Sequence, residues 1–356
     1  MIIPTRKDVM QKAANQGYKI AAVMPIHYPR AILRACGFHP MEVWGPPFIN
    51  NREGTQHFPE YTCDIVQKAA YFLTQEHAAS IDVILIPHTC DSLQGMASIF
   101  MDFIKPKQPV LKIYHPRSHR ASDVIYLEKE IKVLTGKLSE ISGIKPTDND
   151  ILAVMEIENE ANRIFADIAQ RREDFAVTDR TFYTFLRSRE YLFAEQFIEL
   201  SREMPTGKAD LKGPGLMISG IVPEPMDLFD QINRFGAHVV IDDLACCSRR
   251  IYQAFNGDNP YKCLAQQLTS MPPDTTLSAP YKSRFEYLKG QVRKSGARGV
   301  LVYNVKFCEP ELFYVPLFEK AMKEEGCPLL FIEGEMSTVI PGQVLNRINA
   351  FVEVLS

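Results

Sequence analysis

Three cysteines stand where the sequence passes from an apolar run or a turn into a helical pattern. Cys90 and Cys308 each follow a short apolar run and a loop, and Cys63 follows Thr62 at the start of an amphipathic stretch. At a helix N-terminus, unpaired backbone N–H groups and the positive end of the helix dipole favour a thiolate over a thiol. Thiolates bind metal, so the three could close around one iron–sulfur cluster and leave one of its irons without a protein ligand. An iron with an open position can act on a substrate as a Lewis acid.

The same cysteines also have plainer interpretations. A free cysteine is among the most commonly buried residue types, so each of the three taken alone is more typical of core packing. A zinc site is disfavoured because the eight cysteines include no C-x-x-C pair. We expect Cys36, Cys263 and Cys327 to pack in the core. The adjacent Cys246 and Cys247 are expected to be packing or loop residues, with a supplementary role at a cluster left open.

Polar residues near these cysteines are candidates for proton transfer and for positioning loops. His88 precedes the second cysteine by two positions, where it could donate a hydrogen bond to substrate or cluster sulfide, or simply cap the end of a strand. Glu53 and His57 lie in a polar loop and are candidates for proton transfer. Asp242 and Asp243 end an apolar run, and we expect one of them to orient loops.

The elements that must position these residues alternate in both halves of the chain. Short apolar runs followed by helical patterns are typical of βαβ units around a parallel sheet. Ligands of such sheets bind beyond the carboxyl ends of the strands, so Cys90 and Cys308 are expected in one crevice. We expect strands over 18–24, 41–44, 83–86, 110–114, 216–219, 239–242, 300–303 and 329–332. Helices are expected over 31–37, 224–235, 316–325 and 341–354.

The middle of the chain has a different texture, with few glycines and dense charge. Apolar residues recur there at three and four positions, which predicts helices over 126–141, 150–171 and 178–204. Glu156, Glu158 and Glu160 are expected on a solvated face, because a spacing of two places them on different sides of a helix. The predicted fold class is α/β, with two Rossmann- or flavodoxin-like parallel-sheet lobes joined by a helical segment. The expected domains are an N-terminal α/β lobe over 1–120, a helical linker over 121–212 and a C-terminal α/β lobe over 213–356.

Composition narrows the function classes. The chain has 356 residues, 46% hydrophobic and 23% charged, which is the composition of an ordinary globular protein and excludes bulk disorder. A net charge of -3 gives no electrostatic footprint for nucleic acid or an anionic membrane. The N-terminus shows no signal segment and no apolar stretch is long enough to span a bilayer, so we expect a cytoplasmic protein.

Four passages resemble a known family, the subunits of 2-hydroxyacyl-CoA dehydratases and benzoyl-CoA reductases. The resemblance covers both expected lobes, and the helical middle is less recognisable. One departure is Cys246-Cys247-Ser248, where relatives commonly have a glycine after the paired aspartates. The passages are ILRACGFHPMEVWGPP over 32–47, PHTCDS over 87–92, GIVPEPMDLFDQINRFGAHVVIDDL over 220–244 and KFCEPELFYVPLFEKAMKEEGCPLLFIEGE over 306–335.

The resemblance implies a cofactor, partners and a reaction type. The family's ligands for a [4Fe-4S] cluster match Cys63, Cys90 and Cys308. Such subunits pair with a homologous subunit or with themselves and receive low-potential single electrons from an ATP-dependent iron–sulfur activator. They dehydrate or reduce an acyl-CoA, the dehydratases through a ketyl radical. A separate activator fits the absence of a G-x-x-x-x-G-K-[ST] nucleotide loop from this sequence.

Two alternatives remain open at this point. Within the family, a homodimeric reductase of small molecules with a sulfide-bridged double-cubane [8Fe-9S] cluster is the second interpretation. From another class, a two-lobed protein could hold a small ligand between its lobes while its cysteines only pack. Metal content after anaerobic purification distinguishes these alternatives.

Overall fold

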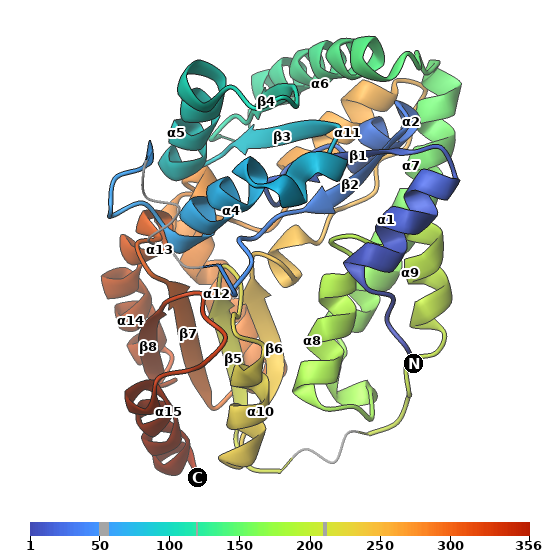
Figure 1. Ribbon diagram of the computed structural model, residues 1–356. Coiled ribbons are helices and arrows are strands. Elements are labelled where there is room, and N and C mark those ends of the chain that lie inside the picture. Colours follow the sequence, from blue (N-terminus) through green and yellow to red (C-terminus); the bar gives the residue numbers. More distant parts are fainter. Residues whose placement is uncertain (50–56, 119, 209–211) are drawn as a thin grey trace.

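The computed structural model describes residues 1–49, 57–118, 120–208 and 212–356. Two four-stranded parallel sheets organise the chain, one in each half (Figure 1), which confirms the predicted α/β fold of two parallel-sheet lobes. The first sheet has the order β2-β1-β3-β4 and the second the order β6-β5-β7-β8, so the two halves repeat one topology. Among the described residues, no helix is long and apolar enough to cross a membrane.

Most of the strands are buried on both faces, as is usual in parallel sheets, while the edge strands β4 and β8 are only partly buried. Their register is continuous except for a shift between Leu216 and Met217 in the second sheet. The first sheet consists of β1 (Lys19–Val23), β2 (Phe38–Glu42), β3 (Val83–His88) and β4 (Val110–Tyr114). The second consists of β5 (Gly215–Gly220), β6 (His238–Leu244), β7 (Gly299–Val305) and β8 (Leu329–Gly334).

Helices cover both faces of each sheet (Figure 1). In the first half these are α1 (Arg6–Asn15), α2 (Arg30–Ala35), α4 (Asp64–Thr74) and α5 (Asp91–Ile99). The middle contains α6 (Ala121–Ser142), α7 (Asp148–Ala169), α8 (Asp179–Ser188) and α9 (Ala194–Ser201). The second half adds α10 (Asp227–Arg234), α11 (Pro260–Thr269), α12 (Tyr281–Ser295), α13 (Glu309–Leu312), α14 (Val315–Glu324) and α15 (Gly342–Leu355).

The single helix expected over 178–204 was wrong, because the chain leaves the helix between α8 and α9. The carbonyls of the intervening turn face the first lobe instead. Glu190 O accepts a bond from Glu42 N at 3.1 Å, and Leu192 O accepts one from Arg30 Nη2 at 2.7 Å. Bonding to distant segments therefore replaces the helical hydrogen bonds at this turn.

Helix α11 shows that the second half of the chain returns to the first lobe. Its Cys263, Leu264 and Leu268 belong to the apolar cluster that also contains residues of β1, β3, α2, α6 and α7. Another cluster runs through both lobes, and a third covers the outer face of the second sheet. The domain boundaries at 120 and 212 stay a prediction.

Glu158 corrects the prediction of a wholly solvated glutamate face on α7. Glu156 and Glu160 are exposed, but Glu158 is buried and accepts a hydrogen bond from Arg34 Nη1 at 2.7 Å. The helix packs against both α2 and α9, so one of the three carboxylates faces inward. Three arginines hold the pKa of Glu158 below its usual range against the cost of burial.

A second buried carboxylate, Asp179, fastens the helical middle to the second sheet. Its Oδ1 accepts from Arg172 Nε at 2.9 Å, and its Oδ2 accepts from Asn233 Nδ2 at 2.8 Å and from Val239 N at 2.9 Å. Both side chains of the Arg172–Asp179 pair are fully buried. Asp179 thus joins α8, α10 and β6 through one group.

We expect Asp179→Ala to lower the free energy of unfolding by about 3 kcal/mol or more, because it leaves a buried guanidinium uncompensated. Urea denaturation followed by circular dichroism measures this. Asp167→Ala is the control: its exposed pair with Arg171 should contribute less than about 1 kcal/mol. Equal losses in the two variants would contradict this role for Asp179.

Candidate functional site

The three candidate cysteines each directly precede a helix. Cys63 is the N-cap residue of α4, Cys90 of α5 and Cys308 of α13, and none of the three side chains caps its helix with a hydrogen bond. Cys90 follows β3 and Cys308 follows β7, as the pattern of strands predicted. Helices α4, α5 and α13 lie on the same side of the molecule (Figure 1).

The three thiols are near enough to affect one another's protonation. The charge of Cys90 helps raise the pKa of Cys63, and the charges of Cys63 and Cys90 both help raise the pKa of Cys308. A backbone hydrogen bond also joins the segments of Cys63 and Cys308, since Asp64 N donates to Lys306 O at 3.4 Å. Segments far apart in the sequence therefore bring these sulfurs into one neighbourhood.

Burial corrects the expectation that the helix N-termini hold these cysteines as thiolates. Loss of solvent is the main cause that raises the pKa of Cys63 to about 12 and also raises those of Cys90 and Cys308. Backbone N–H groups of the following helices do act in the predicted direction, but they are outweighed. In the metal-free chain the three groups are thiols, and binding a metal must release their protons.

The donor set of the three cysteines is the one that an iron–sulfur cluster takes, since such clusters are held by cysteine thiolates. Over the described parts of the chain, no group of three or more His, Cys, Asp or Glu side chains is arranged to hold one metal ion. Cys63 and Cys308 are buried and Cys90 is partly buried. Their role as ligands stays a prediction.

Two of the three polar candidates lie within the described residues. His88 ends β3 and packs edge-on against Tyr114, with ring centroids 4.6 Å apart, and partial burial together with Arg117 lowers its pKa. His57 is exposed, and Glu53 lies outside the described residues. None of these placements tests a role in proton transfer.

A pair of histidines that the sequence analysis missed lies at the carboxyl ends of β1 and β4. His27 is fully buried with a left-handed φ of 59°, directly after Ile26 at 56°. Its Nε2 is 3.9 Å from Asp274 Oδ1, and its ring centroid is 5.7 Å from that of His115. Burial lowers the pKa of His115 to about 3, so that ring is neutral. The rule that singled out Cys90, position just beyond a strand, could have found His27, but nothing in the pattern marks Asp274.

The paired aspartates anchor a buried charge network beside the third cysteine. Asp243 pairs with Arg249 and Arg284, and Arg249 Nη1 donates to Glu311 Oε1 at 2.5 Å. The charge of Glu311 in turn helps raise the pKa of Cys308. This network ties the end of β6 to the helix that Cys308 begins.

The other aspartate supports a turn. Asp242 Oδ1 accepts from Leu244 N at 3.0 Å and from Ser248 N at 2.9 Å, around the turn that contains Cys246 and Cys247. Both cysteines are fully buried, with their sulfurs 3.6 Å apart.

A largely apolar cavity of about 410 Å³ adjoins α4, the helix that Cys63 begins. Lys68 of α4 donates to Pro47 O and Met336 O, which holds the loop over the cavity against the helix. The ion pair between Arg187 and Glu224 forms part of the wall. The apolar side chains that line the cavity include Met10, Ile20, Ala22, Met41, Trp44 and Phe72. A space of this volume is typical of sites for small organic groups.

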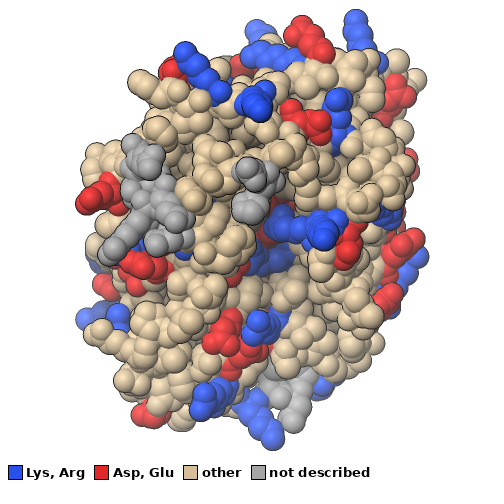
Figure 2. Space-filling model, in the orientation of Figure 1, with Lys and Arg blue, Asp and Glu red and all other residues tan. Residues whose placement is uncertain are grey.

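Charge on the face shown in Figure 2 is mixed, with acidic and basic side chains interspersed and a hollow near the centre edged by Lys and Arg.

Large apolar side chains are exposed near each of the helices that the three cysteines begin. Tyr61 is 67% exposed, Phe103 76% and Phe313 76%.

Comparison with known proteins extends over almost the whole chain. The β subunit of (R)-2-hydroxyglutaryl-CoA dehydratase from Acidaminococcus fermentans is 27% identical over 367 residues, covering 98% of this chain and 96% of that subunit. The β subunit of lactoyl-CoA dehydratase from Anaerotignum propionicum is 23% identical, covering 98% and 95%. One of the subunits of benzoyl-CoA reductase from Thauera aromatica is 24% identical, covering 90% and 86%.

The family description "2-hydroxyglutaryl-CoA dehydratase, D-component" matches residues 25–355, from just after the first strand to the last helix. The match includes all three candidate cysteines and seven of the eight strands. The resemblance carried by the four sequence passages is therefore confirmed, and this chain belongs to the 2-hydroxyglutaryl-CoA dehydratase D-component family.

Proposed function

We propose that this chain is the iron–sulfur subunit of a cytoplasmic enzyme that dehydrates or reduces a CoA thioester with low-potential single electrons. The observation that carries the proposal is the common placement of Cys63, Cys90 and Cys308, each at the N-terminus of a helix, two of them buried and Cys90 partly buried, and each within electrostatic reach of another. Relatives matched along nearly their whole length are subunits of dehydratases and a reductase of this type.

The cluster, when bound, supplies single electrons and an iron that can polarise the thioester oxygen. The chain's own residues supply the surroundings. Backbone N–H groups of Val66, Leu93 and Glu311 point at the three sulfurs, where they stabilise thiolate charge. The fully buried His27 and the buried His115 and Asp274 keep the nearby carboxyl ends of the first sheet largely closed to solvent.

The apolar cavity beside α4 supports an acyl-binding site that prefers uncharged acyl groups. Its wall charges are Arg6, Glu42, Arg187 and Glu224. Each is already paired, Arg6 with Glu190, Glu42 with Arg250 and Arg187 with Glu224, so a carboxylate on the acyl group would enter without a partner of its own. An aromatic or aliphatic acyl group buries apolar surface there at no such cost. We assign the cavity to the apolar part of the acyl group.

A partner subunit is supported by the relatives, which are named as subunits of dehydratases and of a reductase. The partner would be a homologous subunit or a second copy of this chain, and we expect it to cover exposed apolar side chains such as Phe103 and Phe313. The ATP-dependent activator belongs to the proposal for a chemical reason, since this sequence contains no phosphate-binding loop of the G-x-x-x-x-G-K-[ST] type.

Replacing Cys63, Cys90 or Cys308 singly by Ala should reduce iron and sulfide from about four of each per chain to near zero, because each ligand holds a different iron. Iron and sulfide analysis after anaerobic purification measures this. Cys327→Ala is the matched control, since its buried sulfur contacts Ala297 O in the core of the second lobe.

Equal metal content in all four variants would refute the ligand assignment, and colourless, metal-free wild-type protein would refute the iron–sulfur function. Circular dichroism of each variant separates loss of the cluster from loss of the fold. Sulfide in excess of iron would indicate the bridged double cubane instead.

Ala22→Leu should weaken binding of benzoyl-CoA by about tenfold or more, because the added side chain occupies the cavity. Trp44, the chain's one tryptophan, lines the cavity, so its fluorescence provides the titration signal. Wild-type protein should bind benzoyl-CoA more tightly than 2-hydroxyglutaryl-CoA.

Ala35→Leu in α2 is the control for Ala22→Leu, because this half-buried position packs against the apolar cluster on the other side of the first sheet. Two results would rule out the cavity as the acyl site. One is that Ala22→Leu binds benzoyl-CoA as tightly as the wild type does, and the other is that the wild type binds 2-hydroxyglutaryl-CoA more tightly than benzoyl-CoA.

A further inference from the structure

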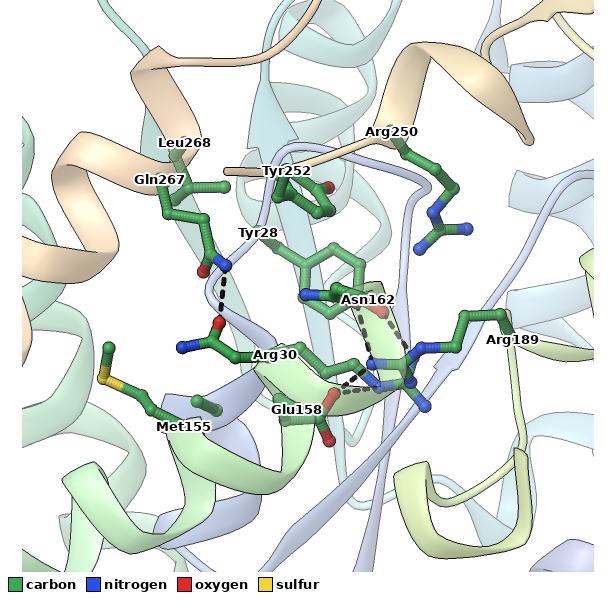
Figure 3. A pocket seen from close by; sticks show the side chains of 12 residues that line it. Tyr28, Arg30, Met155, Glu158, Asn162, Arg189, Arg250, Tyr252, Gln267 and Leu268 are labelled. Atoms are coloured by element: carbon green, nitrogen blue, oxygen red, sulfur yellow. Dashed lines mark hydrogen bonds and ion pairs between the residues drawn. The ribbon is translucent and has the colours of Figure 1, made fainter. Parts of the chain in front are cut away.

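A buried group of arginines surrounds Glu158 where α2, α7 and the turn after α8 meet (Figure 3). Arg34 Nη1 donates to Glu158 Oε1 at 2.7 Å, and Arg30 Nε lies 3.5 Å from Glu158 Oε2. Arg189 Nη2 donates to the same Oε2 and, at 3.1 Å, to Asn162 Oδ1. A single carboxylate is therefore shared by three guanidinium groups.

Arg189 is incompletely bonded although it is only 2% exposed. Its Nε and Nη1 are buried and have no hydrogen-bond partner in the structure. Arg172 offers a contrast, because its Nε, Nη1 and Nη2 donate to Asp179, Phe175 O and Val177 O. Leaving buried charged donors without acceptors is destabilising, because they have given up hydrogen bonds to water. The Arg189 site therefore lacks an acceptor.

Positive charge exceeds negative charge in this group. The guanidinium groups of Arg30, Arg34, Arg189 and Arg250 face the buried carboxylates of Glu42 and Glu158 and the half-exposed carboxylate of Glu195. Tyr28 adds no negative charge, because burial raises the pKa of its hydroxyl. One elementary positive charge is left without an opposing charge inside the cluster.

A small cavity adjoins the unpartnered donors. It measures about 30 Å³ and is lined by side chains that include Arg30, Arg189, Arg250, Tyr252 and Gln267 (Figure 3). This space accommodates one water molecule or one monatomic ion. It is too small for a phosphate ester or a carboxylate with its organic substituent.

We propose that this cavity binds one small monovalent anion of the size of chloride. A water molecule could accept hydrogen bonds from Arg189 Nε and Nη1, but it would leave the excess positive charge of this buried cluster uncompensated. An anion supplies both the acceptor and the charge. It would also join Arg30, at the end of the first lobe's β1 loop, to Arg250, which follows the last strand residues of β6.

Crystals grown or soaked in bromide test the site directly, because bromide scatters anomalously and replaces chloride. We expect an anomalous peak in the cavity beside Arg189 Nε. Density that refines as water, with no anomalous peak, overturns the proposal.

A solution measurement distinguishes a resident anion from an ion that is merely adventitious in the crystal. The unfolding temperature of the wild type should rise by about 2 °C or more when gluconate is exchanged for chloride at constant ionic strength. A bromide peak in the crystal without this chloride dependence would mean an adventitious ion only and would overturn the proposal.

Asn162→Asp is the decisive variant, because it places a carboxylate where the amide oxygen already accepts from Arg189. The built-in charge should abolish the dependence on chloride while the protein stays folded. Arg172→Gln, which alters a fully bonded buried arginine, should lower stability but keep the chloride dependence. Retained dependence in Asn162→Asp, or its loss in Arg172→Gln, would count against the site.

Discussion

The buried ion pair between Glu42 and Arg250 joins the carboxyl ends of the two sheets. Arg250 Nη1 donates to Glu42 Oε2 at 2.9 Å across 208 positions of sequence, and Tyr28 donates to Oε1 of the same carboxylate at 2.9 Å. Arg250 holds the pKa of Glu42 below its usual range although burial acts in the opposite direction. A pair of this kind is costly to bury and costly to break, so it fixes one relative placement of the lobes.

The relative placement of the two lobes decides which side chains at the carboxyl ends of the strands meet. Cys90 and Cys308 come from equivalent positions of two sheets with the same topology, and Cys63 from the start of the helix after β2. Each sheet alone would present one or two sulfurs to solvent. Facing one another, the lobes enclose three of them, and the same burial that makes the metal-free thiols weak acids would shield a bound cluster from water.

Charged residues account for most of the differences between the predicted and the observed structure. Glu158 was expected on a solvated surface, and the turn that separates α8 from α9 was expected to be helical. Both deviations have one cause: arginines such as Arg30 and Arg34 reach from the first lobe into the helical middle. Helical periodicity describes which faces are apolar, but it contains no information about which distant cation will neutralise a carboxylate.

The sequence by itself determined the elements and the kind of chemistry. All eight strands were expected near their observed positions, because short apolar runs flanked by breakers such as proline favour buried strands. The cysteines at the helix starts could be singled out for the same local reason, and the family resemblance implied partners and a cofactor for them. Only the tertiary structure decided how His27 meets Asp274, which carboxylates are buried and where the cavities lie. These depend on side chains brought together from segments up to hundreds of residues apart, and such contacts leave no periodic trace in the chain.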